Sequence, residues 1–294
     1  MDKSILSKLT SLGCSIFKDE LLSKHCSFKI GGPASYFIEV QNEEALFLFL
    51  KNIGTDKFFI LGGGTNVLFS DDGYNGFVVS LIGKFKEIAV CGDDIICGSG
   101  ALLSNVLNVS LKNNLTGLDF VSGIPGSTGG AVCGNAGSKD KWVDSVIKEV
   151  IIYEDGQKVL LKRKQIDFSY RKSSLEKNIL LSVCFSLKKI IENDNLSTVF
   201  ESTQRRLKTQ PLNFPNAGSI FKNPKGLSIG KLIEEAGLKG VRVGGAQISD
   251  IHGNFIINIG GALAKDVLAL ISLIEKNIYK QFNIKLETEI KIIK

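Results

Sequence analysis

The sequence predicts an α+β protein with more than one domain, and two observations support this prediction. A chain of 294 residues is long enough for roughly two domains of about 150 residues each, with three small ones possible. Strand-like and helix-like hydrophobic patterns alternate near both ends of the chain, whereas strand-like patterns outnumber helix-like ones in the middle. The middle of the chain is therefore expected to form an α+β unit of its own.

The first eighty residues predict a small βαβ-like unit. Their apolar runs predict strands at 35–40, 57–61 and 76–80, and their apolar spacing predicts a helix at 43–52. Three consecutive glycines directly follow the strand at 57–61.

The middle of the chain is rich in strands. Gly92 and Asp93 separate strand-like runs at 86–91 and 94–97, as is typical of a β-hairpin. A helix is expected at 103–113, and further strands are expected at 146–153, 158–161 and 179–187. The polar segment 190–196 is the best candidate for a linker between domains.

After the linker, helices and strands alternate again. A helix that runs toward residue 209 must end before Pro211, since proline cannot continue a helix. We expect helices at 229–236 and over an apolar face from Val267 to Phe282, and strands at 255–259 and 286–293. Alternation along the last strand makes Glu289 a surface carboxylate.

Composition disfavours several classes of protein. The formal charge of +6 comes from 31 Lys and 5 Arg spread along the chain, so a nucleic-acid role has little support. No run of about 18 apolar residues predicts a membrane span, and the first residues lack the apolar core of a secretory signal. The two histidines and six cysteines show no zinc spacing, which predicts no metal site and buried, reduced thiols in the cytoplasm.

Two glycine-rich segments are the strongest motif. We call residues 61–66 the first knot and residues 123–137 the second knot; the second holds six glycines in fifteen residues. Glycine lets a backbone turn with positive φ or approach a ligand closely, and exposed backbone N–H groups bind phosphate. Tight turns are the simpler interpretation of either knot alone, but the pair favours a cradle for one large anionic ligand.

Other nucleotide-binding motifs are missing. No Gly-x-Gly-x-x-Gly follows a predicted strand, so a Rossmann dehydrogenase is disfavoured. Residues 226–231 resemble a P-loop but are one residue short, and they more simply begin a helix. Ser219 lies in a small-residue segment suited to a polar substrate, although a turn or helix cap is the commoner role of such a serine.

Six blocks in order, at 25–34, 61–66, 123–131, 135–137, 170–171 and 217–224, are similar to the UDP-N-acetylenolpyruvoylglucosamine reductase family. The resemblance covers nearly the whole chain, and the short interval from Arg171 to Ser219 resembles the compact subgroup without the extra substrate-covering insertion. It implies an α+β fold with a two-part flavin-binding domain of the vanillyl-alcohol/p-cresol oxidase type and a C-terminal α/β substrate-binding domain. The implied parts are 1–80, to which a final strand near 285–294 returns, then 81–195, and then 196–294.

The resemblance also implies the chemistry. NADPH reduces non-covalently bound FAD, and the enolpyruvyl ether of UDP-N-acetylglucosamine then accepts the hydride to give UDP-N-acetylmuramate, a cytoplasmic step of peptidoglycan precursor synthesis. No protein partner, nucleic acid or membrane is implied. By motif, Arg171 stabilises the enolate and Ser219 donates the proton. Glu289 assists, although Glu287 is adjacent and Thr288 replaces the usual proline.

The implied binding residues follow the same blocks. Candidates for FAD are Gly62, Gly63, Gly64, Thr65, Asn66, Gly123, Ile124, Pro125, Gly126, Ser127, Gly130, Asn135, Ala136 and Gly137. Candidates for the substrate are Tyr170, Lys208, Asn223, Gln247 and His252. Two alternatives stay open: another flavin-dependent oxidoreductase of the same fold, and a non-catalytic module that binds a nucleotide or flavin.

Overall fold

The computed structural model describes residues 1–138, 141–190 and 195–294, with the side chains of 195, 196 and 198 left aside. Most of the predicted linker, 190–196, therefore lies outside the described residues. The helices are α1 (Lys3–Ser11), α2 (Glu43–Asn52), α3 (Leu103–Lys112), α4 (Thr128–Cys133), α5 (Asn195–Thr209), α6 (Ile229–Glu235) and α7 (Ala264–Phe282).

The strands of the first 190 residues include most of those expected. They are β1 (Ser15–Leu21), β2 (Pro33–Val40), β3 (Phe58–Leu61), β4 (Val67–Phe69), β5 (Tyr74–Leu81), β6 (Ile88–Cys91), β7 (Asp94–Gly98), β8 (Leu115–Thr116), β9 (Gly137–Ser138), β10 (Lys141–Trp142), β11 (Ile147–Glu154), β12 (Gln157–Lys162), β13 (Phe168–Ser169), β14 (Lys172–Ser173), β15 (Ile179–Ser186) and β16 (Lys188–Lys189). The remaining strands are β17 (Asn216–Ser219), β18 (Arg242–Val243), β19 (Ala246–Ile248), β20 (Phe255–Asn258) and β21 (Lys291–Ile293).

Contacts divide the chain into two units. The first unit comprises residues 1–18, 36–63 and 76–204, and the second comprises 19–35, 64–75 and 205–294. Neither unit is continuous in sequence, because the chain passes between them several times. The expected boundaries at 80/81 and 195/196 stay a prediction.

The first unit is built on two sheets. One has the strand order β1-β2-β5-β3, with most of its residues in this unit, and the other has the order β12-β11-β15-β7-β6. Strands β6 and β7 pair antiparallel, as the pattern around Gly92 and Asp93 predicted, and the expected strands β11 and β12 also pair antiparallel. Helix α2 begins at the predicted residue because the Asn42 side chain accepts the Ala45 N–H at 2.9 Å.

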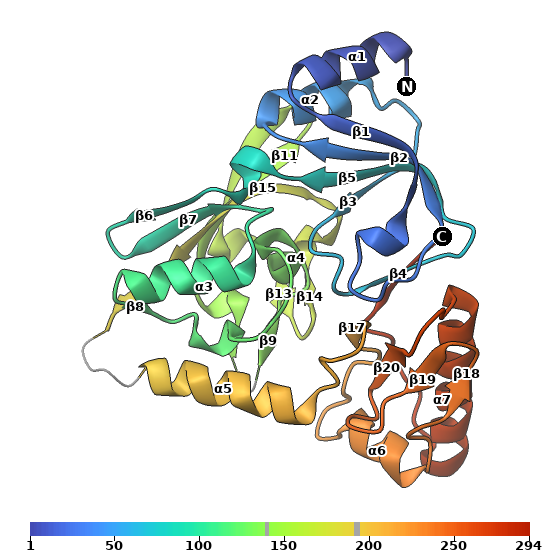
Figure 1. Ribbon diagram of the computed structural model, residues 1–294. Coiled ribbons are helices and arrows are strands. Elements are labelled where there is room, and N and C mark those ends of the chain that lie inside the picture. The colour runs from blue at the N-terminus through green and yellow to red at the C-terminus, as the bar shows by residue number, and fades with distance from the viewer. Residues whose placement is uncertain (139–140, 191–194) are drawn as a thin grey trace. The chain divides into compact units, whose positions relative to one another are not determined.

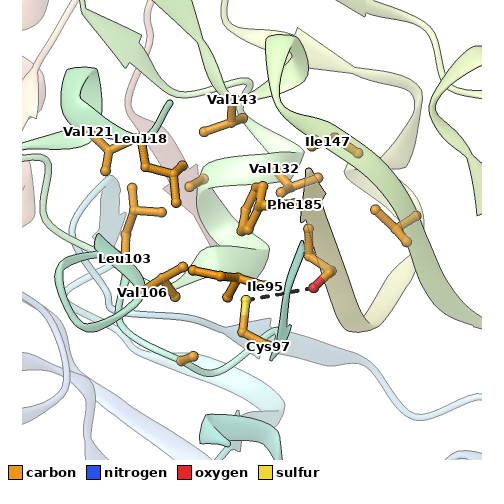
Figure 2. Packing of buried hydrophobic residues seen from close by; sticks show 14 of the residues in the cluster. Ile95, Cys97, Leu103, Val106, Leu118, Val121, Val132, Val143, Ile147 and Phe185 are labelled. Carbon is orange, nitrogen blue, oxygen red and sulfur yellow. Dashed lines mark hydrogen bonds between the residues drawn. The ribbon is translucent and has the colours of Figure 1, made fainter. Parts of the chain in front are cut away.

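A buried apolar cluster of the first unit anchors α4, the short helix inside the second knot. Val132 of α4 and Phe185 of β15 are both fully buried. Figure 2 shows their side chains pointing toward each other, among residues from β7 and α3. The second knot is therefore no continuous loop, because its middle is a helix held by packing.

The second unit carries an antiparallel sheet of order β17-β20-β19-β18. Helix α7 packs against β18 and β19, as the orange and red ribbons of Figure 1 show. Its buried face includes Val267, Leu270, Ile271, Ile274 and Ile278, which are residues of the predicted apolar face. No described helix is long and apolar enough to cross a membrane.

Two expectations are wrong here, and one strand was not predicted. The final strand covers only Lys291–Ile293 instead of 286–293, because Thr288 and its neighbours bond to the segment after β17. It pairs in parallel with β4. Strand β1 was not predicted, because its central residues are exposed and charged and its apolar residues do not alternate. Cys91, expected to be buried, is exposed on β6, a strand at the edge of its sheet.

Candidate functional site

The two knots touch each other within the first unit. A methyl group built on Gly63 would lie 2.7 Å from the Cα of Gly126, and one on Gly62 would collide with the Ser127 hydroxyl. Real Cβ atoms do not approach backbone so closely, so only glycine permits this contact. The structure thus brings together two segments that are about sixty residues apart in sequence, as the sequence analysis expected of one cradle.

The backbone at this junction is chemically suited to an anion. The N–H groups of Gly62, Gly63, Gly126 and Ser127 donate to no acceptor in the described part of the chain. Gly62 and Gly63 are also exposed. Neighbouring backbone N–H groups without protein acceptors form the kind of nest that binds phosphate oxygens, so these residues fit the pyrophosphate of a dinucleotide cofactor.

The helix α4 itself offers fewer donors than the glycine count suggests. The Thr128 N–H donates to Ala101 at 2.8 Å, and the Gly129 N–H donates to Ser99 at 2.8 Å. The Ser127 hydroxyl caps the helix by accepting the Gly130 N–H at 3.3 Å. The N–H groups of Thr128, Gly129 and Gly130 therefore already have acceptors within the protein. A cofactor contact through Gly130 stays a prediction.

Arg171 lies at the tip of the hairpin formed by β13 and β14, also in the first unit. Its φ of 56° is in the left-handed region, which is uncommon for a residue other than glycine and occurs often at functional sites. Its Nη1 donates to the Gly137 carbonyl at 3.1 Å. Its guanidinium lies 5.6 Å from the ring centroid of Tyr170, which is exposed.

The end of the second knot supports this hairpin. Asn135 is buried with a φ of 41°, and its Nδ2 donates to the Ser169 carbonyl at 3.0 Å while its Oδ1 accepts the Asp144 N–H at 3.3 Å. Both ends of the Asn135 amide are thus bonded to backbone. Cofactor contacts by Asn135, Ala136 and Gly137 stay predictions, but Asn135 and Gly137 hold the Arg171 hairpin.

Ser219 lies in the second unit at the end of β17, not in a simple turn or helix cap. It pairs with Phe255 of β20, and the register is irregular between Asn216 and Ser219. Gly218 has a φ of 77°, which bends the strand just before the serine. Ser219 is half-buried, so its hydroxyl is neither locked in the core nor fully in solvent.

Glu289 lies beside the serine segment in the same unit. Its N–H donates to the carbonyl of Ile220 at 2.7 Å, and its own carbonyl accepts from Asn66 Nδ2 at 3.1 Å. Glu289 is half-buried, so its expected place as a surface carboxylate is wrong. Glu287, in contrast, is exposed and pairs with Lys222 at 2.7 Å. The Glu287 carbonyl also accepts the Lys222 N–H at 2.9 Å, so both residues adjoin the segment after Ser219, and the catalytic role of Glu289 stays a prediction.

The first knot contributes its second half to this neighbourhood of the second unit. The Gly64 carbonyl accepts the Ser27 N–H at 3.0 Å, and the Ser27 hydroxyl donates to the Asn216 carbonyl at 2.6 Å. A methyl group on Gly218 would lie 4.0 Å from the Thr65 carbonyl oxygen. Residues 64–66, β17 and Glu289 are thus neighbours.

Three of the four candidate substrate residues in the second unit have hydrogen-bond partners within the protein. The Asn223 Oδ1 accepts the Ile229 N–H at 3.0 Å, and the buried Gln247 donates to Asp250 at 2.7 Å. The His252 Nδ1 accepts the Asn254 N–H at 3.2 Å, and burial lowers the pKa of His252 below its usual value. Lys208 is exposed near the end of α5. Substrate contacts by these four residues stay predictions.

Asn254 is a residue that the sequence analysis did not identify. It is 2% exposed, and its side chain bonds the backbone of Phe221, two residues after Ser219. Its only sequence signal is an Asn after Gly253 before an apolar strand, a pattern that ordinary turns share.

Comparisons with known proteins match two different domains to two parts of the chain. Residues 34–162 match the model of an FAD binding domain, and residues 210–293 match that of the UDP-N-acetylenolpyruvoylglucosamine reductase C-terminal domain. These matches confirm the predicted flavin-binding fold followed by a C-terminal domain.

Relatives and a solved structure match over almost the full length. A UDP-N-acetylenolpyruvoylglucosamine reductase of Clostridium botulinum (strain Okra / Type B1) is 41% identical over 95% of this chain and 92% of the relative. That of Clostridium tetani is 39% identical over 99% of this chain and 97% of the relative. The crystal structure of the reductase from Thermus caldophilus has a TM-score of 0.84 at 34% identity, over 96% of this chain and 99% of that chain. The chain belongs to the UDP-N-acetylenolpyruvoylglucosamine reductase family.

Proposed function

We propose that this chain reduces the enolpyruvyl ether of UDP-N-acetylglucosamine to UDP-N-acetylmuramate, with FAD as cofactor and NADPH as reductant. The observation that carries the proposal is the 2.7 Å hydrogen bond from the Glu289 N–H to the Ile220 carbonyl. This bond holds Glu289, one predicted catalytic residue, next to Ile220, which directly follows Ser219, a second predicted catalytic residue.

The junction of the two knots would hold the cofactor. Its backbone donors on Gly62, Gly63, Gly126 and Ser127 match the charge of the FAD pyrophosphate. FAD, when bound, carries a hydride from NADPH to the vinyl terminus of the substrate. The remaining knot residues, Gly64, Thr65, Asn66, Gly123, Ile124, Pro125, Gly130, Asn135, Ala136 and Gly137, belong to the same proposal.

Arg171 stabilises the charge that develops on the substrate. When the vinyl terminus gains two electrons and a proton, negative charge moves to the carboxylate side as an enolate. A guanidinium presents a planar fork of donors that matches two oxygens at once. The Nη1 bond to Gly137 fixes the orientation of this fork before the substrate arrives.

Ser219 gives the proton that completes the reduction. The carbon of an enolate is strongly basic, so a correctly aimed hydroxyl can protonate it despite the high pKa of serine. Glu289 stabilises the same intermediate. The balance of the step is one hydride and one proton added across the carbon–carbon double bond, after which the Ser219 oxygen regains a proton from solvent.

The remaining assignments complete the proposal. Tyr170, Lys208, Asn223, Gln247 and His252 contact the substrate, and the reaction takes place in the cytoplasm, where NADPH and nucleotide-sugar precursors occur. We retain the division into 1–80, 81–195 and 196–294. The boundary at 195/196 is supported because the two family matches, 34–162 and 210–293, end and begin on either side of it.

The experiment is an anaerobic titration in two steps. Purified protein with bound flavin is yellow, bleaches on addition of NADPH, and regains its colour when the enolpyruvyl substrate is added. Bleaching without recovery of colour on the second addition would remove the proposed function. A fluorescent band on a denaturing gel would show covalent flavin and favour an alcohol oxidase of the same fold instead.

A further inference from the structure

The side chain of Asn254 hydrogen-bonds to the backbone of the segment that follows Ser219. Its Oδ1 accepts the Phe221 N–H at 3.0 Å, and its Nδ2 donates to the Phe221 carbonyl at 2.8 Å. The carbonyl of Asn254 also accepts the Ile220 N–H at 2.9 Å. One buried residue therefore makes three hydrogen bonds to the two residues after the serine.

The Ile220 bond belongs to the pairing of β17 with β20, and the two side-chain bonds continue the connection where that pairing ends. The pairing of β17 with β20 is irregular before Ser219 and ends at Ser219, where the serine faces Phe255. The left-handed Gly218 makes the backbone before the serine an unusual bend. The strand before Ser219 is irregular and does not fix the direction of the serine side chain. That direction therefore depends on how Ile220 and Phe221, which follow the serine, are held.

The same segment determines the place of Glu289. The Ile220 carbonyl accepts the N–H groups of Glu289 and Ile290, at 2.7 and 3.4 Å. Since the Ile220 N–H is bonded to Asn254, both polar backbone groups of Ile220 are engaged. Ile220 thus lies between the two: its N–H donates to the Asn254 carbonyl, and its own carbonyl accepts the Glu289 N–H.

Asn254 is itself held rigidly. Its N–H donates to His252 Nδ1 at 3.2 Å, and the Ser249 hydroxyl accepts the N–H groups of Ile251 and His252. A polar side chain that is 2% exposed, with its amide oxygen and nitrogen both bonded, has little freedom to move.

We infer that Asn254 is a positioning residue for proton transfer: its side chain holds the segment after Ser219 and so aims the Ser219 hydroxyl. This inference rests on the proposed role of Ser219. Asparagine suits the task because its amide is both a donor and an acceptor, and both functions are needed on the Phe221 backbone. Aspartate has the same shape but, when ionised, cannot donate to the Phe221 carbonyl and is repelled by it.

The test uses Asn254→Asp in the FAD-loaded protein, with Asn258→Asp as the matched control. Asn258 is also on the β20 segment and buried; its Nδ2 donates to the Phe28 carbonyl at 3.1 Å and its Oδ1 accepts two backbone N–H groups. The control therefore loses the same kind of bond in the same unit without touching the residues after Ser219.

Rapid mixing under anaerobic conditions measures the two half-reactions separately. We expect Asn254→Asp to slow flavin reoxidation by the enolpyruvyl substrate about 10- to 100-fold, because a misplacement of about 1 Å costs up to that much. Flavin reduction by NADPH should change less than about twofold, since it needs no serine proton. Asn258→Asp should leave both rates near those of the wild type.

A double substitution separates positioning from a general loss of structure. In the Ser219→Ala background, Asn254→Asp should produce no further slowing, because the group that it aims is gone. Slowing that is equal in both half-reactions, additive in the double variant, or matched by Asn258→Asp would overturn the inference. Should Asn254→Asp fail to fold, Asn254→Ser, which is smaller and uncharged, takes the same tests.

Failure of the inference and failure of the proposed function give different results. If the wild-type flavin is not reoxidised by the enolpyruvyl substrate, the proposed function is wrong. If it is reoxidised and Ser219→Ala is as fast as the wild type, the serine is not the proton donor and Asn254 has no proton transfer to position. If Ser219→Ala slows flavin reoxidation but the Asn254 variants reoxidise as fast as the wild type, the positioning role of Asn254 is refuted and the proposed function stands.

Discussion

Substitution of Gly63 by alanine tests whether the contact between the two knots builds the cofactor site. The new Cβ would lie 2.7 Å from the Gly126 Cα and 3.2 Å from the Ser127 N. Carbon atoms pack at about 3.5–4.0 Å, so the knots must separate by about 1 Å. Overpacking of this kind typically costs about 1–3 kcal/mol of folding free energy.

The effect on the cofactor follows from the same displacement. The shift would move the N–H groups of Gly62 and Gly63 away from those of Gly126 and Ser127, so that the four groups would no longer converge on one anion. A hydrogen bond to a charged group contributes about 1.5–3 kcal/mol. Loss of one such bond weakens FAD binding roughly tenfold to a hundredfold.

The assay is titration of flavin-free protein with FAD, followed by flavin fluorescence, together with thermal unfolding of the same samples. Gly134→Ala is the control from the second knot: its φ is −88° and the nearest atom to its new Cβ is 3.4 Å away. It should bind FAD like the wild type and be no less stable, since alanine loses less entropy on folding. Wild-type FAD affinity in Gly63→Ala would refute the role given to the junction.

Three further predictions concern the second unit. Ser219→Ala should leave flavin reduction by NADPH intact and slow reoxidation by the substrate severely; equal loss of both half-reactions in rapid mixing would mean that Ser219 is structural. Glu289→Gln should slow reoxidation, whereas Glu287→Gln, which alters only an exposed pair with Lys222, should not; the opposite ranking would assign the carboxylate to Glu287. Because burial lowers the pKa of His252, the unfolded chain binds more protons, so this residue's contribution to stability is complete above about pH 6.5 and is lost as the pH falls. Urea unfolding of His252→Gln at about pH 7.5 and 5.5 should therefore show a smaller pH dependence than that of the wild type, and an equal dependence would contradict the buried neutral imidazole.

Elements with a local cause were predictable. Helix α2 has its Asn42 cap and its apolar spacing within the same twelve residues, and the β6–β7 hairpin has its turn residues between two apolar runs. Helix α7 follows the predicted apolar face. In each case neighbouring residues supply the hydrogen bonds and the buried side chains that stabilise the element, so their order in the sequence is sufficient.

Elements that depend on distant partners were not predictable in the same way. The segment before β21 has the alternation of a strand, yet its residues Glu287 and Glu289 bond to Lys222 and Ile220, which follow β17 about 65 positions earlier. Glu289 is half-buried for that reason. The division of the chain into two discontinuous units has the same cause, because packing and not sequence position groups residues 19–35 and 64–75 with 205–294.

The two glycine knots were identified from the sequence because glycine is the residue that permits positive φ and close backbone approach. The roles of Arg171 and Ser219 were expected only from the resemblance to a family. Which of these residues meet was decided by tertiary structure. It placed Gly63 against Gly126, gave the N–H groups of the first turn of α4 acceptors within the protein, and bonded both Glu287 and Glu289 to the segment after Ser219. It also revealed Asn254, whose role exists only because a buried amide reaches backbone more than thirty residues away, and no local pattern encodes that distance.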